Sequence, residues 1–258
     1  MDVSIPRKKD GLPLLYKSDI EEIAEMYLWD FNSQILKEPM QTPIDEFLEN
    51  YLKLDMDYKD ITQDGSILGL TAFDNGFLNV YDPESKKIRS IYVKKGTVII
   101  DNSLLNKNQE GRYNFTSGHE AGHWILHREM FKAKRDQFSF WDSINGKEMP
   151  SIKCFKKSFE NYASRRTFKT NNDWMEWQAN YMASCLLMPK KMFKVVTSEI
   201  FKKFRINGDY IILGQDFETD EIAVEIAKKI SIVFGVSVTA ASIRLSQLRY
   251  IREKTIQL

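Results

Sequence analysis

The stretch His119-Glu120-Ala121-Gly122-His123-Trp124-Ile125-Leu126-His127 contains every histidine of the 258-residue chain. Its first five residues follow the pattern H-E-x-x-H. On a helix, residues four apart are offset by only about 40° and rise by about 6 Å, so His119 and His123 project from one face. Two imidazole nitrogens at that spacing can bind one Zn²⁺, and Glu120 would then lie beside the metal as general base toward a water molecule. The stretch therefore predicts a helix with zinc hydrolase chemistry, although so short a pattern also occurs in helices that bind no metal.

The third protein ligand of such a site has to come from elsewhere, because a catalytic zinc uses three protein ligands and a water. His127 lies about 80° round and about 12 Å along the helix from His119, too far for three nitrogens to meet at one ion. We interpret it as a helix-end residue or one that supports a ligand from behind. Cys154 and Cys185 are possible ligands, but isolated cysteines are usually small buried apolar residues. A carboxylate is the better candidate.

Glu176 is the strongest candidate for that carboxylate. It is the only acid in segment 174–189, which predicts a helix that starts after Asn172 or Asp173 and ends at Pro189. On this helix Glu176 shares a face with small and apolar residues, namely Ala179, Ala183 and Leu187. An acid that faces the interior is costly unless it is paired or binds a metal. The alternative is a solvent-exposed acid in the first turn that complements the helix dipole.

Together the two motifs resemble a known family. The pattern H-E-x-G-H-x-x-L-H at residues 119–127, followed by E-x-x-A-N-x-x-A-x-x-L-L-M-P at residues 176–189, is similar to the ImmA/IrrE type of metallopeptidase. The strand-like segment 96–102 and the ending 234–248 extend the resemblance, which covers roughly residues 55–250. Two departures stand out. Met182 replaces the usual Phe. Residues 128–172 form a long basic insertion, so the resemblance does not determine the identity of the substrate.

The resemblance implies a zincin-like fold with one zinc per chain, held by His119, His123 and Glu176, and with Glu120 as catalytic base. His127 and Asn180 are candidates to support the metal ligands. Members of this family are associated with cleavage of helix-turn-helix repressors, often those of mobile elements or stress responses. The resemblance therefore implies a protein substrate of that regulatory kind.

Composition and charge limit the binding partners and the cellular compartment that we expect. The net charge of +1 gives no general attraction to nucleic acid or membrane. The amino-terminal residues lack a continuous apolar segment, and no run of 18 apolar residues exists, so neither an export signal nor a membrane span is predicted. Two cysteines without an export signal indicate a reducing cytoplasm. The oligomeric state is left open.

The periodicity of the chain predicts an α+β fold with a small, mostly antiparallel sheet. Ser18 and Glu21 read as a capping box that opens a helix to about residue 36, and Thr42-Pro43 opens a second helix. Strands are predicted at 67–73, 77–81, 88–93 and 97–100, with a hairpin turn at 74–76 and a second loop at 82–85. We expect a helical segment at 1–54, a metallopeptidase core at 55–215 with the insertion at about 128–172, and a C-terminal helical segment at 216–258.

Two segments raise the possibility of nucleic-acid binding. Residues 128–169 carry eleven Lys and Arg against five Asp and Glu, interleaved with aromatic residues. We favour a lid near the cleft whose aromatic residues belong to the core and whose lysines are solvated, and such a lid could also attract an acidic substrate. Residues 218–250 predict two helices around the turn at 234–237, as in helix-turn-helix units. Most of the second helix looks core-directed, so that only Arg244 and Arg249 could reach DNA.

These observations together predict a cytoplasmic zinc endopeptidase that cleaves a regulatory protein, with oxyanion stabilisation from a Tyr, an Arg or backbone N–H groups. The alternative is a transcriptional regulator or interaction protein whose zinc site is structural or vestigial.

Overall fold

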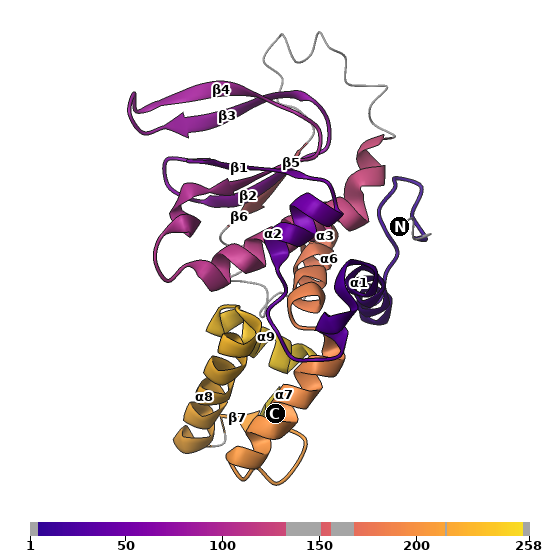
Figure 1. Cartoon of the computed structure of the whole chain (residues 1–258), viewed down its shortest axis with the longest axis vertical. Helices are drawn as coiled ribbons and strands as arrows, with labels where there is room; N and C mark the ends of the chain where they lie inside the picture. Colours follow the sequence, from indigo (N-terminus) through magenta and orange to yellow (C-terminus); the bar gives the residue numbers. More distant parts are fainter. Residues whose placement is uncertain (1–4, 133–150, 156–167, 215, 255–258) are drawn as a thin grey trace.

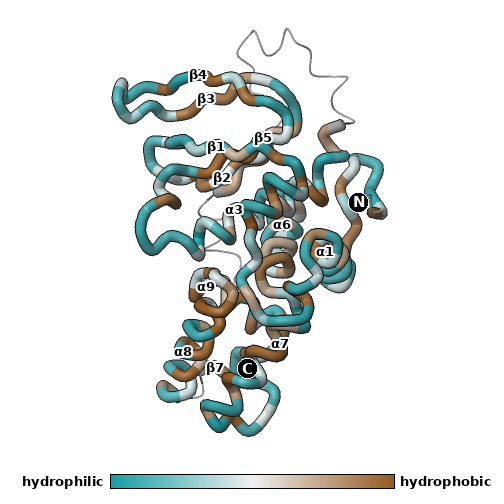
Figure 2. The backbone as a smooth tube through the Cα atoms, in the orientation of Figure 1, coloured by the Kyte–Doolittle hydropathy of each residue, from teal (hydrophilic) through white to brown (hydrophobic). Residues whose placement is uncertain are grey.

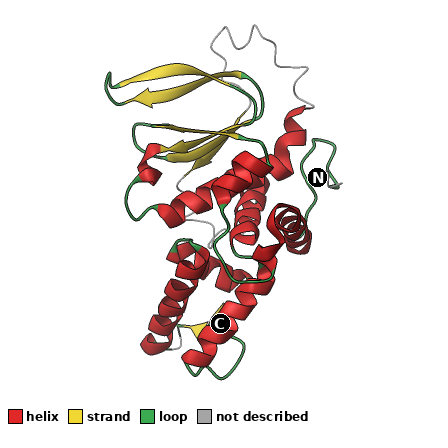
Figure 3. Ribbon diagram, viewed as in Figure 1, coloured by secondary structure: helices red, strands yellow, loops and turns green. Residues whose placement is uncertain are grey.

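A computed structural model describes residues 5–132, 151–155, 168–214 and 216–254 of the chain. A four-stranded sheet lies between a β-hairpin on one side and a group of helices on the other, and a further set of helices forms the opposite end of the molecule (Figure 1; Figure 3). The predicted α+β class is confirmed.

The central sheet has the strand order β1-β5-β2-β6. Its strands are β1 (Asp55–Lys59), β2 (Ile67–Ala72), β5 (Thr97–Asp101) and β6 (Ser151–Phe155). β1 and β5 run parallel, whereas the β5–β2 and β2–β6 pairs are antiparallel. β2 and β5 are buried along their whole length, and the predictions at 67–73 and 97–100 are confirmed. The sequence pattern missed the two outer strands, β1 and β6.

The β-hairpin consists of β3 (Gly76–Asp82) and β4 (Lys87–Val93), which pair with each other and form a sheet of their own. The predicted hairpin turn at 74–76 is therefore wrong, because β2 and β3 do not pair. The hairpin turn consists of residues 83–86 between β3 and β4, which overlaps the predicted loop at 82–85. Leu78 and Val80 pack against Leu70 and Ile99 of the central sheet, which fixes the hairpin on the sheet's outer face. Figure 2 shows the hairpin loop as hydrophilic and the central strands as largely hydrophobic.

On the other face of the central sheet, α3 (Glu110–Lys132) lies against β2, β5 and β6. α6 (Asn171–Leu187) packs on α3, and α1 (Lys17–Asn32) packs on α6, all within one core. The short α2 (Ile44–Glu46), its π-helical continuation Phe47–Tyr51 and 3-10 turns at Ser33–Leu36 and Asn102–Leu105 accompany these helices. β2 bulges between Ile67 and Gly69, so that Leu68 and Gly69 both face the helices. This places the middle of β2 directly against α3.

Two predicted helix starts need correction. Helix α1 begins at Lys17, where the backbone N–H of Tyr16 donates to Asp19 Oδ2 at 2.7 Å. Glu21, expected in a capping box, is buried instead. Helix α6 begins after Thr170, whose hydroxyl accepts from the Asp173 backbone N–H at 3.1 Å. In each case the helix starts where a side chain accepts a hydrogen bond from a backbone N–H that has no partner within the helix.

The C-terminal end contains α7 (Lys190–Lys203), α8 (Phe217–Phe234) and α9 (Val238–Gln247), with a small parallel pair of strands, β7 (Ile211–Leu213) and β8 (Ile251–Glu253). The two helices predicted around 234–237 are confirmed. Of the two arginines that could reach DNA by the sequence pattern, Arg244 is fully buried and therefore cannot, whereas Arg249 is exposed. In the described part of the chain, no single helix is long and apolar enough to cross a membrane; α8 and α9 meet the length and composition criteria only as a pair bent by 106°.

The basic segment predicted as an insertion is partly built into the core. Helix α3 continues to Lys132, and β6 adds an edge to the central sheet beside β2. The rest of the predicted insertion, at 133–150 and 156–167, lies outside the described residues. Residues 128–172 are therefore not a lid throughout.

Candidate metal centre

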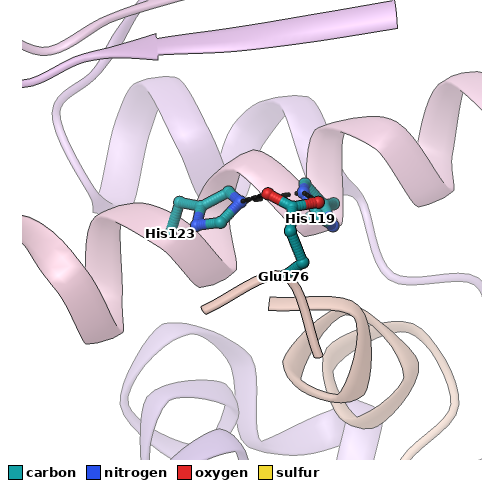
Figure 4. Close-up of side chains that lie close together, drawn as sticks. All are labelled: His119, His123 and Glu176. Carbon is teal, nitrogen blue, oxygen red and sulfur yellow. Dashed lines mark hydrogen bonds and ion pairs between the residues drawn. The ribbon is translucent and has the colours of Figure 1, made fainter. Parts of the chain in front are cut away.

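Helices α3 and α6 bring two histidines and one glutamate together inside the core. His119 and His123 lie one turn apart on α3, with their Nε2 atoms 2.8 Å apart. Glu176 reaches over from α6, placing its carboxylate oxygens 3.7 Å from His119 Nε2 and 3.4 Å from His123 Nε2 (Figure 4). All three residues are at most 3% exposed. The structure thus brings together the three residues proposed as metal ligands, within 4.8 Å of one another.

Small residues allow the two helices to approach this closely. Gly122 lies between the two histidines, against Ala179 of α6. A Cβ atom at position 122 would meet the Ala179 carbonyl oxygen at 3.0 Å and its Cα at 3.1 Å. The lower helix propensity of glycine, about 1 kcal/mol relative to alanine, is thus offset by a helix–helix distance that lets Glu176 reach the histidines.

The Nδ1 atom of each of these two histidines lies within hydrogen-bond distance of a partner. His119 Nδ1 lies 3.0 Å from Asn180 Oδ1, and His123 Nδ1 lies 3.0 Å from His127 Nδ1. His127 in turn contacts Gln178 Oε1 through Nε2 at 2.9 Å. Such partners orient a metal-binding imidazole and select which nitrogen carries its proton. His127 and Asn180 both occupy supporting positions behind the ligands.

Glu120 lies next to this cluster and faces β2. Its Oε2 accepts a hydrogen bond of 2.5 Å from the Thr71 hydroxyl, while its Oε1 has no hydrogen-bond partner among the described residues. Gly69 leaves room for the carboxylate, since a Cβ atom there would lie 2.6 Å from Oε1. Burial raises the pKa of Glu120 well above its ordinary value, and the nearby charge of Glu176 adds to this against the opposing hydrogen bond from Thr71.

Both cysteines are buried, as the sequence indicated, but only Cys154 lies at the centre. Cys154 pairs with Gly69 across the sheet and therefore faces α3, with its sulfur within 4.8 Å of His119 and Glu120 ligand atoms. Burial, reinforced by the charges of Glu120 and Glu176, raises its pKa well above the ordinary value, which disfavours a thiolate. Cys185 lies instead beside Arg244.

The chemistry of the donor set fits a divalent metal ion. Burial above all lowers the pKa of His119 and of His123 to about 3, so both imidazoles are neutral at pH 7 and each keeps one lone pair. When each Nδ1 is engaged with its supporting residue, both Nε2 lone pairs point at the same place as the carboxylate of Glu176. Two nitrogens and one carboxylate form a set that suits zinc and leaves a coordination position open.

Sequence reasoning missed two residues of the centre, Thr71 and Gln178. Thr71 lies in a strand far from the motif, and nothing local marks it. Gln178 is buried two residues after Glu176, where a polar side chain within an apolar helix is a usable signal. A cleft of about 1340 Å³ also adjoins Gln178, together with Pro13, Trp174 and Trp177, but its lining includes none of His119, Glu120, His123 and Glu176.

Comparison with known proteins supports the motif resemblance. A peptidase family model described as the IrrE N-terminal-like domain matches residues 152–246. The match contains Glu176 and the E-x-x-A-N motif and begins after helix α3. A search of curated proteins finds no match to the chain. The predicted resemblance to the ImmA/IrrE type is confirmed over these residues, and the matched family suggests a metallopeptidase kind of function.

Proposed function

We propose that this chain, a metallopeptidase relative through its IrrE N-terminal-like segment, is a zinc-dependent endopeptidase that cleaves a regulatory protein. One observation carries the proposal: the two histidines of the H-E-x-x-H motif and Glu176 converge in the core while Glu120 lies beside them. A structural zinc site has four protein ligands and no open coordination position, so it does not need a neighbouring carboxylate that acts as a base.

The proposed roles follow from the geometry. His119, His123 and Glu176 hold the metal. Zinc, when bound, supplies a Lewis acid that polarises the scissile carbonyl and makes water more acidic. Glu120 takes the proton of the attacking water on Oε1, since Oε2 is held by Thr71. Burial raises its pKa, which makes it a stronger base than an ordinary carboxylate. Glu120 then delivers the proton to the leaving amine.

A protein substrate is the class that the architecture supports. β6 pairs with β2 on one side and forms the outer strand of the described sheet next to the centre. An extended peptide can add to such an edge through main-chain hydrogen bonds. Glu120 and the three ligands are at most 3% exposed, so substrate reaches them only when part of the covering structure moves. Helix-turn-helix repressors are the substrates that the family resemblance favours.

The proposal is tested by separating metal binding from chemistry. Purified Glu120→Gln is expected to keep one zinc per chain while cleavage of a helix-turn-helix repressor falls by about 10²- to 10⁴-fold, because an amide cannot accept the proton. Glu176→Ala is expected to lose zinc, measured by elemental analysis. Cys154→Ser, a matched change beside the centre, is expected to retain it.

Full activity in Glu120→Gln would remove Glu120 as the base and favour the alternative of a regulator with a structural zinc site. Retention of zinc by Glu176→Ala together with its loss from Cys154→Ser would make the cysteine the third ligand.

A further inference from the structure

A chain of buried hydrogen bonds connects the N-terminal segment to the metal centre. The Gln178 side-chain nitrogen donates to the Pro13 carbonyl oxygen at 2.9 Å. Gln178 Oε1 lies 2.9 Å from His127 Nε2, and His127 Nδ1 lies 3.0 Å from His123 Nδ1. All four residues are buried. These hydrogen bonds therefore connect the residues before α1, through α6, to the proposed metal ligand on α3.

The Pro13 carbonyl, at the outer end of this series of hydrogen bonds, determines the direction of each bond in it. The Pro13 carbonyl can only accept a hydrogen bond, so the amide nitrogen of Gln178 must face it and the amide oxygen must face His127. That oxygen also only accepts, so His127 carries its proton on Nε2. A neutral imidazole has one proton, which leaves His127 Nδ1 as an acceptor. His123 must then donate from Nδ1, and its Nε2 keeps a bare lone pair.

That lone pair is the one that faces Glu176, 3.4 Å away. The opposite proton arrangement would place a proton on His123 Nε2 and block it as a ligand. His119 is held differently: its Nδ1 lies 3.0 Å from the Asn180 side-chain oxygen. Among the hydrogen bonds described here, the bond to Pro13 anchors the proton order at His123 from outside the two ligand helices.

We propose that Gln178 and His127 are positioning residues that hold His123 in its Nδ1–H tautomer, and that the Pro13 carbonyl makes the N-terminal segment part of the metal centre. This inference rests on the proposed metal site but not on peptidase activity. It gives the buried third histidine of the H-E-x-x-H-x-x-x-H run a role that a packing residue would not have.

The first test reads the protons directly. The chain has three histidines, all within residues 119–127, so long-range ¹H–¹⁵N correlation of histidine-labelled, metal-stripped protein at pH 7 resolves each ring. The expected result is a proton on Nδ1 of His123 and on Nε2 of His127. A proton on Nε2 of His123 in the unaltered protein would overturn the proposal, whatever any variant does.

The second test removes the anchor. Gln178→Met keeps the length of the side chain but removes the acceptor, so His127 is free to carry its proton on Nδ1 and to force the proton of His123 onto Nε2. Zinc affinity, measured by chelator competition, is expected to fall about 10- to 100-fold. Gln178→Glu keeps an oxygen toward His127 and is expected to restore both the tautomers and the affinity to within a few fold.

Tyr181→Phe is the matched control. It removes a hydrogen bond to Glu21 from the same helix and leaves the hydrogen bonds between Pro13, Gln178, His127 and His123 in place. It is expected to leave histidine signals and zinc affinity unchanged. Equal zinc affinity in Gln178→Met and the parent would contradict the proposal. A protein with the expected tautomers and affinities but without peptidase activity would instead count against the proposed function alone.

Discussion

Burial sets the protonation of the side chains around the metal centre. His119, His123 and His127 are fully buried, and burial lowers the pKa of each, to about 3 for the first two. Glu120 is equally buried, and its pKa is raised for the same reason, since a low-dielectric interior disfavours any charged form. One physical cause thus leaves the three histidines neutral and makes the glutamate a stronger base.

The metal-free protein is expected to lose stability as the pH falls from about 6.5 toward 3. In this range the unfolded chain binds protons at three histidines of ordinary pKa near 6.5, whereas the folded histidines stay neutral. Glu120 acts in the opposite direction, because its raised pKa lets the folded state bind one proton. Three sites outweigh one, so the unfolded state binds more protons, and each excess proton lowers the unfolding free energy by about 1.4 kcal/mol per pH unit.

Urea denaturation of chelator-treated protein at pH 7 and pH 5 measures this dependence. An unchanged or higher free energy of unfolding at pH 5 would show that the histidines are already protonated, or exposed, in the folded protein.

Helices α3 and α6 depend on each other for the metal centre, because each supplies part of it. Neither helix alone places a carboxylate near two imidazoles. Gly122 and Ala179 set their separation, and Gly118 contributes a second point of close packing against Ala183 and Leu187. The two glycines differ in what surrounds them. Backbone atoms of α6 lie at 3.0 and 3.1 Å from a Cβ at position 122, whereas a flexible Leu187 methyl group at 3.3 Å is the nearest atom at position 118.

Gly122→Ala is therefore expected to destabilise the protein by about 1–3 kcal/mol, the range for overpacking a tight core, and to weaken zinc binding as α6 shifts. Gly118→Ala serves as its control. There the leucine can move, and the gain in helix propensity of up to about 1 kcal/mol offsets the crowding. Thermal unfolding with and without zinc measures both. A Gly122→Ala protein as stable as Gly118→Ala would show that the helix separation is not set at position 122.

Over the whole molecule, a buried ion pair joins the N-terminal and C-terminal parts of the chain. Arg244 of α9 donates from Nη1 and Nη2 to the two carboxylate oxygens of Glu21 in α1, each at 2.8 Å. Its Nε donates to the Met188 carbonyl oxygen at the end of α6, and the Tyr181 hydroxyl donates to Glu21. Burial alone would raise the pKa of Glu21, but the hydrogen bonds and charge of Arg244 outweigh it and lower that pKa below 4.5. The pair thus contributes stability above the ordinary pKa that is lost as pH falls through the folded value.

Arg244→Met is expected to destabilise the protein by about 3–5 kcal/mol, because it leaves the Glu21 carboxylate buried without its counter-charge. The double variant Glu21→Met with Arg244→Met is expected to recover most of that loss. Arg249→Met, an exposed arginine nearby in sequence, is expected to change stability by less than about 0.5 kcal/mol. Chemical denaturation of these three variants, of the single variant Glu21→Met and of the parent measures the differences, and a loss in the double variant equal to the sum of the two single losses would show that the two charges do not interact.

The features that the sequence predicts well are those in which neighbouring residues decide the outcome. His119 and His123 share a face because four residues complete about one helical turn. The strands β2 and β5 follow from short runs of apolar and β-branched residues, and α8 and α9 from periodicity on both sides of the turn at Gly235. Glu176 is predicted as a ligand because it is an acid on an otherwise apolar helix face.

What the sequence leaves open depends on contacts between residues that are far apart in the chain. β1 and β6 have weak patterns and become strands because β5 and β2 offer free hydrogen-bonding edges. Glu21 has the local pattern of a helix cap, yet it is buried in the core, where it pairs with Arg244, 223 residues away. The hydrogen bond from Thr71 to Glu120 and the one from Gln178 to the Pro13 carbonyl likewise cannot be predicted from local periodicity. A buried polar group must find a partner, and packing alone decides which partner lies within reach.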